Sequence, residues 1–131
     1  MLKRVASASA AAFVCLWLPT ALAGAGPTVK TKVLIDGYEA VGDEVRFSGR
    51  VGSPRRACEK RRRVLVIGRD VEAGDATRVL GRDRTGPRGR YLVAEQIPFP
   101  EDFAWAKVKR VRVSDGKACS GDRSPEISTA G

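Results

Sequence analysis

The stretch that decides the fold is Cys58-Glu-Lys-Arg-Arg-Arg-Val-Leu-Val-Ile-Gly68. Four consecutive apolar residues, three of them β-branched, lie between a charged entry and a glycine exit. The run is too short for a helix, and β-branching favours a strand. A strand without polar alternation is typical of one covered on both faces, so we expect residues 64–67 to form the central, fully buried strand of a two-layer β protein.

Patterns on either side of this strand also favour β structure. Residues 29–35 and 45–51 alternate apolar and polar side chains, and shorter strand signals occur at residues 77–82, 90–94 and 126–129. Turn signals containing glycine, proline or aspartate separate them. The sequence therefore predicts an all-β two-sheet sandwich of about seven strands.

The longest strand candidate, residues 103–113, changes phase along its length. Its first half places Ala104, Ala106 and Val108 on one face, whereas Val111 and Val113 fall on the other. A β-bulge near residues 109–110 would bring all five to the core side. We then expect Phe103, Trp105, Lys107 and Arg112 on the outer face.

The N-terminus has the pattern of a secretory signal peptide, which we assign to residues 1–25. Lys3 and Arg4 precede an apolar stretch, and small-x-small sites follow at residues 21–23 and 23–25. A retained membrane anchor is the alternative, but the apolar stretch is shorter than the roughly 20 residues that span a bilayer. We expect one secreted or cell-envelope-associated domain, residues 27–131, with no transmembrane segment. Cys15 is then lost with the signal peptide.

Charge and cysteine content describe that domain further. Without Lys3 and Arg4, 22 basic and 15 acidic side chains give a net charge of +7. Such an excess suits an acidic partner or simply aids solubility, and in an exported protein we do not expect nucleic acid. Cys58 and Cys119 remain, and an even number in an exported chain predicts a disulfide, with two free thiols as the alternative.

Several motifs occur in an order that resembles a known group of domains. They are Phe47-Ser-Gly-Arg-Val51, the Cys58 strand, Thr85-x-x-x-Gly89-x-Tyr91, Ala104-x-Ala106 and Cys119-x-x-x-x-Ser124-Pro125. The chain resembles small exported Ig-like β-sandwich domains of actinobacterial type, with the carboxypeptidase regulatory-like or prealbumin-like pattern. Gly86 stands where that group has an aspartate in the turn. The resemblance implies a fold and an export route, and it carries no common catalytic residue.

The sequence argues against an enzyme. It contains no histidine, so no Ser/His or Cys/His nucleophile system is available. Acidic pairs at residues 43–44 and 101–102 lie in predicted turns, where solvated or capping carboxylates are more common than acid–base pairs. No calcium-loop spacing is present, so we expect no metal site, no cofactor and no catalytic residue.

Two non-enzymatic roles remain open. A structural or scaffold role needs only the sandwich. The alternative is a binding module whose basic face, formed by Arg61, Arg63, Trp105, Lys107 and Arg112, meets an acidic glycan, a lipid headgroup or an acidic protein. The direction of Trp105 separates them: an exposed ring favours binding, and a ring buried in the core, with Ala104 and Ala106 outward, favours a scaffold. Because aromatic residues in strands are usually buried, the sequence favours the scaffold.

Overall fold

The computed structural model describes residues 27–113 and 116–130. The predicted signal peptide, its cleavage sites and Cys15 lie outside the described residues. The described part of the chain contains no α-helix, and the predicted all-β class is confirmed. No helix in these ranges has the length and apolar character needed to cross a membrane.

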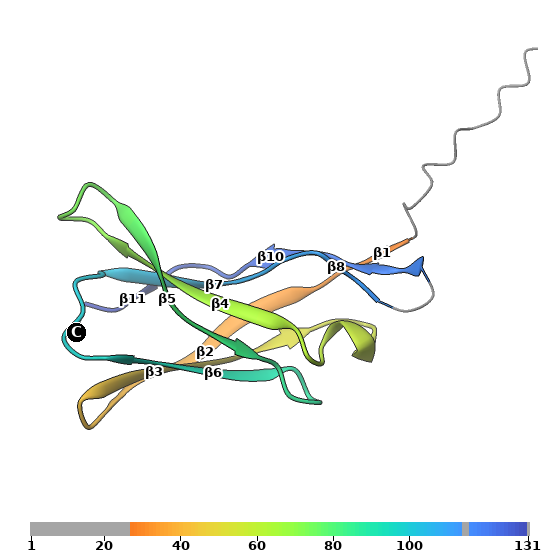
Figure 1. The fold of residues 1–131 in the computed structure, drawn as a ribbon, viewed down its shortest axis with the longest axis horizontal. Coiled ribbons are helices and arrows are strands. Elements are labelled where there is room, and N and C mark those ends of the chain that lie inside the picture. The colour runs from red at the N-terminus through yellow and green to blue at the C-terminus, as the bar shows by residue number, and fades with distance from the viewer. Residues whose placement is uncertain (1–26, 114–115, 131) are drawn as a thin grey trace, which may run out of the picture.

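Two sheets form the body of the molecule. One has the strand order β10-β7-β4-β5, with β11 also on β7, and the other has the order β2-β3-β6 (Figure 1). All pairings within them are antiparallel. The strands are β2 (Lys32–Val41), β3 (Glu44–Gly52), β4 (Arg63–Asp70), β5 (Ala76–Arg84), β6 (Arg90–Gln96), β7 (Phe103–Val108), β10 (Asp122–Arg123) and β11 (Ile127–Ser128).

The core lies between these two layers. Strand β3 alternates strictly, so Val45, Phe47 and Val51 point inward, as the sequence predicted. Val64 and Val66 of β4 face them, both with no exposed surface. Leu65 and Ile67 are only half-buried on the outer face, so the prediction that residues 64–67 are covered on both sides is wrong for these two. The strand is central in its sheet, but nothing in the described chain packs fully over its outer face.

A glycine lets one buried polar group approach the backbone. The Tyr91 hydroxyl donates a hydrogen bond of 2.7 Å to the Leu34 carbonyl oxygen across the inner surface of β3. A β-carbon on Gly49 would overlap both groups, so only glycine fits between them. Burial raises the pKa of Tyr91, as does the negative charge of Asp36.

A third, small sheet closes one end of the molecule. It contains β1 (Thr28–Val29), β9 (Ala118–Cys119) and β8 (Val111–Arg112). The 3-10 turn η1 (Arg56–Cys58) brings Cys58 to β9, and the predicted disulfide with Cys119 is confirmed, with a sulfur–sulfur distance of 2.04 Å. The bridge closes a loop of 61 residues, which in the chain-entropy model is worth about 4 kcal/mol.

Two strand predictions were wrong in detail. Residues 103–113 form two strands in different sheets, β7 and β8, because the chain leaves the large sheet after Val108. Val111 is consequently 41% exposed and does not join the core. The strand predicted to end at residue 35 continues to Val41 as β2, through a bulge at Asp36-Gly37 where a side chain on residue 37 would press against the Ser48 hydroxyl.

Candidate anion-binding groove

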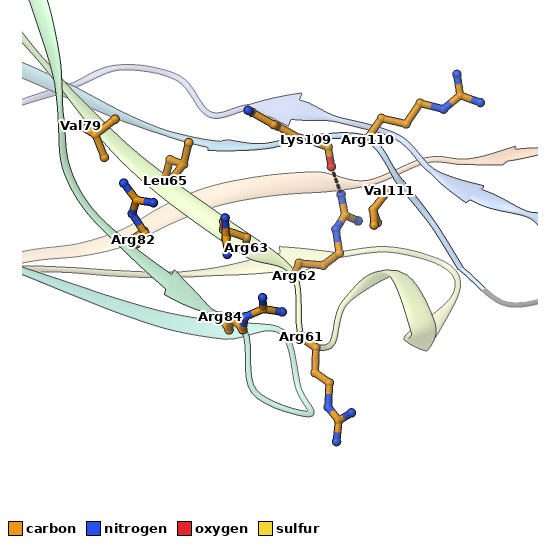
Figure 2. Close-up of a pocket in the computed structure, with 10 residues that line it drawn as sticks. All are labelled: Arg61, Arg62, Arg63, Leu65, Val79, Arg82, Arg84, Lys109, Arg110 and Val111. Atoms are coloured by element: carbon orange, nitrogen blue, oxygen red, sulfur yellow. Dashed lines mark hydrogen bonds between the residues drawn. The ribbon is translucent and has the colours of Figure 1, made fainter.

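A groove lies on the outer face of the β10-β7-β4-β5 sheet, at the end where β4 begins and β5 ends (Figure 2). It has a volume of about 470 Å³. Its floor contains the apolar side chains of Leu65, Val79 and Val111. Among the residues that the structure describes, no acidic residue lines it, whereas seven basic residues do: Arg61, Arg62, Arg63, Arg82, Arg84, Lys109 and Arg110.

A bulge in β5 gathers these arginines on one face. The pairing with β4 shifts between Val66 and Ile67, so both Leu80 and Gly81 lie on the core side. Without this extra residue, strict alternation from Leu80 would direct the next arginine into the sandwich. The bulge therefore places Arg82 and Arg84 outward, beside the residues of β4 that face solvent.

Arg63 and Arg84 stand directly opposite each other in neighbouring strands. Cross-strand neighbours lie about 5 Å apart, and like charges in this position are destabilising. Figure 2 shows the two side chains close together at the centre of the groove. The carboxylate of Asp83 accepts hydrogen bonds from the backbone N–H groups of Arg84 and Leu92, and it forms no ion pair with either arginine side chain. The pair is electrostatically unfavourable in the unliganded protein.

The absence of compensation extends to the whole groove. Among the described residues, no carboxylate oxygen lies within 4 Å of the side-chain nitrogens of Arg61, Arg63, Arg82, Arg84, Lys109 or Arg110. A cleft lined by one sign of charge concentrates counter-ions of the opposite sign. The groove therefore carries positive charge that no described carboxylate offsets by direct contact.

Arg62 has a different task from the other arginines. Its side chain is buried and donates to the carbonyl oxygens of Cys58, Lys109 and Ser120 at 2.8–3.1 Å, and to the Thr31 hydroxyl at 3.1 Å. Burial lowers its pKa. The guanidinium joins four chain segments beneath the groove, so Arg62 supports the site rather than offering charge to a ligand.

Arg61 adopts an unusual backbone conformation that separates it from Arg62. Its φ of 54° lies in the left-handed region, which costs a residue with a side chain about 1 kcal/mol. Its N–H donates to the Thr85 carbonyl oxygen at 2.9 Å. In Figure 2, Arg61 points away from the body while Arg62 turns inward. This conformation lets adjacent arginines serve opposite roles.

The predicted binding face is only partly brought together. Arg61 and Arg63 line the groove, and Lys107 lies on the same sheet face opposite Leu65. Arg112 lies on β8 in the small sheet, separated from them by the change of sheet after Val108. The expectation that Arg112 shares the outer face of Lys107 is therefore wrong.

Trp105 fits neither of the two arrangements considered from sequence. Ala104 and Ala106 face the core, so the tryptophan is on the outer face, yet it is only 6% exposed. The Arg123 guanidinium covers it, 4.1 Å from the ring centroid. The ring is thus buried outside the core and does not line the groove.

Sequence reasoning missed Arg82, Arg84, Lys109 and Arg110. The pair Arg82-x-Arg84 was visible as a period-two signal, but the predicted strand stopped at residue 82 and its facing was unknown. Only the register of β5 with β4 shows that Arg84 stands opposite Arg63 and that Arg82 stands opposite Leu65.

Three of the four acidic residues considered for chemistry, Glu44, Glu101 and Asp102, have structural partners. Buried Glu101 accepts hydrogen bonds from the Arg78 guanidinium, and Asp102 accepts one from the Val71 N–H. Glu44 pairs with Arg46 at 2.8 Å. Within the described ranges, no group of three or more acidic or cysteine side chains is arranged to hold a metal ion.

Comparison of the chain with protein families, with curated proteins and with solved structures found no match.

Proposed function

We propose that this chain is an exported, non-enzymatic β-sandwich domain that binds an anionic ligand in the groove around Arg63 and Arg84. The observation that carries the proposal is the like-charged cross-strand pair without a carboxylate partner. An anion bound between the two guanidinium groups relieves their repulsion and accepts hydrogen bonds from both. Arginine suits this task because its planar fork matches carboxylate, sulfate and phosphate oxygens.

The fold assignment and export belong to the same proposal. We assign the two-sheet sandwich to the Ig-like type, on the strength of the motif order described above. The Cys58–Cys119 disulfide supports export through a signal peptide, because such bonds persist in oxidising compartments. The protein would then act outside the cytoplasm, secreted or at the cell envelope.

The test is calorimetric titration of the purified protein with a compact polyanion, inositol hexakisphosphate. We expect measurable binding that weakens as salt rises, since exposed charges are screened. The double variant Arg63→Gln, Arg84→Gln should lose at least about tenfold in affinity, because both central guanidinium groups are removed.

A matched control exists on the opposite sheet. Arg50 and Arg90 also stand opposite each other, between β3 and β6, but Asp36 lies 3.8 Å from Arg50. The variant Arg50→Gln, Arg90→Gln removes the same charge and should keep wild-type affinity. Equal losses in the two double variants, or no binding to the wild type, would reject the groove as a specific site.

A scaffold role is the second candidate, and one observation favours it. Trp105 is covered by Arg123, whereas a binding face centred on this tryptophan needs it exposed. If the domain is only a scaffold, it should bind the polyanion no more tightly than its net positive charge alone would allow. The same titration separates the two candidates.

A further inference from the structure

Three hollows meet at one residue, Arg61. The groove on the sheet face is the first. A second, of about 510 Å³, is lined by Lys60, Arg61, Thr85, Gly86 and Pro87. A third, of about 280 Å³, is lined by Ala57, Lys60, Arg61, Arg62, Val111 and Val113. The three hollows are therefore neighbours, and they share Arg61 at the end of the sandwich. We call this row of hollows the path.

Positive charge follows this path along its whole length. Arg110 and Lys109 lie at one end, Arg63 and Arg84 in the middle, and Arg61 with Lys60 at the other end. In Figure 2, Arg110 extends to the upper right and Arg61 extends downward, each away from Arg63 and Arg84. Within residues 27–113 and 116–130, no acidic side chain lines any of the three hollows. A single small anion would meet only the middle pair, so the outer cations indicate a longer ligand with repeated negative charge.

The side chains that line the path indicate which class of anionic polymer fits it. In the described part of the chain no aromatic side chain lines the path, so unstacked bases of a single-stranded nucleic acid would find no ring to stack on. A duplex is read by an element that projects into its groove, whereas this surface is concave. The floor of the groove is aliphatic, formed by Leu65, Val79 and Val111, and it suits the C–H faces of sugar rings.

We infer that the ligand is a linear acidic polysaccharide, carrying sulfate or carboxylate groups, that lies along the path from Arg110 through Arg63 and Arg84 to Lys60. This inference rests on the proposed anion-binding function and specifies its ligand. The central arginines hold one or two acidic groups of the chain, and the outer cations hold the groups on either side.

The experiment is a length series of sulfated oligosaccharides of the heparin type, from about two to about eight sugar units, titrated into the whole protein. Affinity should rise with length until the chain spans the path, and then level off. The slope of log K against log salt concentration should steepen over the same lengths, because each additional contact releases a counter-ion.

Variants separate the middle of the path from its ends. Arg63→Gln with Arg84→Gln should weaken binding of every length. Lys60→Gln with Arg110→Gln should leave the shortest oligosaccharide unaffected, remove the gain with length and lower the salt slope by about two. Arg50→Gln with Arg90→Gln, on the opposite sheet, should change neither. These side chains are exposed, and among the described residues only Arg50 has an ion-pair partner, so the variants should fold, and melting curves verify it.

Three outcomes would overturn the inference. If affinity does not depend on oligosaccharide length while inositol hexakisphosphate still binds through Arg63 and Arg84, the proposed anion-binding function stands and the polysaccharide inference is rejected. A single-stranded oligonucleotide, or a polyglutamate peptide, that binds more tightly than a sulfated oligosaccharide of equal charge would assign the path to that class instead. If neither the compact polyanion nor any oligosaccharide binds, the proposed function fails as well.

Discussion

The two ends of one sheet face use arginine in opposite ways. At one end of β4, Arg69 lies between Asp75 and Glu126, at 2.7 and 2.9 Å, and stacks over Phe103 at 4.6 Å. Arg63 stands at the other end of β4, about 20 Å away by strand geometry, opposite a second arginine and without a carboxylate partner among the described residues. The same residue type is thus neutralised by the fold at one end and left to a ligand at the other.

The paired end also explains why the aromatic residues of β7 are covered. Arg123 stacks on Trp105 and contacts Glu126 at 3.3 Å, while the same carboxylate group holds Arg69 over Phe103. One glutamate therefore orients two guanidinium groups over two rings. Charge at this end stabilises the attachment of the C-terminal strands, so the comparison predicts that its arginines affect stability whereas those of the groove affect binding.

The largest expected effect concerns two adjacent arginines, Arg62 and Arg63. Arg62→Met removes the donor for three backbone carbonyl oxygens in the buried network. Acceptors left without a partner should lower the free energy of unfolding by about 3 kcal/mol, or the melting temperature by about 15 °C. Arg63→Met is the matched control, because its exposed side chain makes no such bonds. Thermal unfolding followed by circular dichroism measures both.

Equal melting temperatures for the two variants would contradict the division of roles. The Arg62→Met protein, assayed well below its melting temperature, should still bind the compact polyanion. The Arg63→Met protein should bind it less well while melting at the wild-type temperature or slightly above it, because the variant also relieves the repulsion with Arg84.

An intermediate effect is expected at the paired end from Arg123→Ala. Removing the guanidinium exposes the Trp105 ring and loses a cation–π contact worth about 1 kcal/mol. Tryptophan emission should shift to longer wavelength and become more sensitive to quenching by acrylamide. Arg69→Ala is the control, because it uncovers Phe103 and should leave the tryptophan emission unchanged. Affinity for the polyanion should not change, and a loss in the Arg123 variant would show that the two ends act together.

The sequence allowed the local features to be predicted and not those that depend on register. Alternation was sufficient for β3, and the count of cysteines was sufficient for the Cys58–Cys119 bond. Arg61 and Arg63 were identified because they flank the apolar run. The position of Arg82 and Arg84 depends on a bulge at Leu80–Gly81, which is a property of the pairing with β4 and leaves no local signal.

Contacts with side chains that are distant in the sequence could not be predicted from the sequence either. Trp105 is buried by Arg123, a residue of another strand, so its own neighbours in the chain could not reveal the cover. Arg62 looked like its neighbours Arg61 and Arg63, yet its partners come from four separate segments. Contacts of this kind are set by tertiary packing and not by periodicity.

The smallest expected effect tests the repulsion at the centre of the groove. Arg84→Gln removes one of two like charges that stand opposite each other. The free energy of unfolding of the unliganded protein should therefore rise by about 0.3 kcal/mol. Added salt should narrow the difference, because screening weakens the repulsion in the wild type only. Arg90→Gln is the control: its opposite residue, Arg50, already has Asp36 at 3.8 Å, so no gain is expected. Denaturant unfolding at low and high salt measures all three proteins. If the wild type is as stable as Arg84→Gln at low salt, the fold already relieves the repulsion between Arg63 and Arg84. The proposal that the groove binds an anion would then lose its main support.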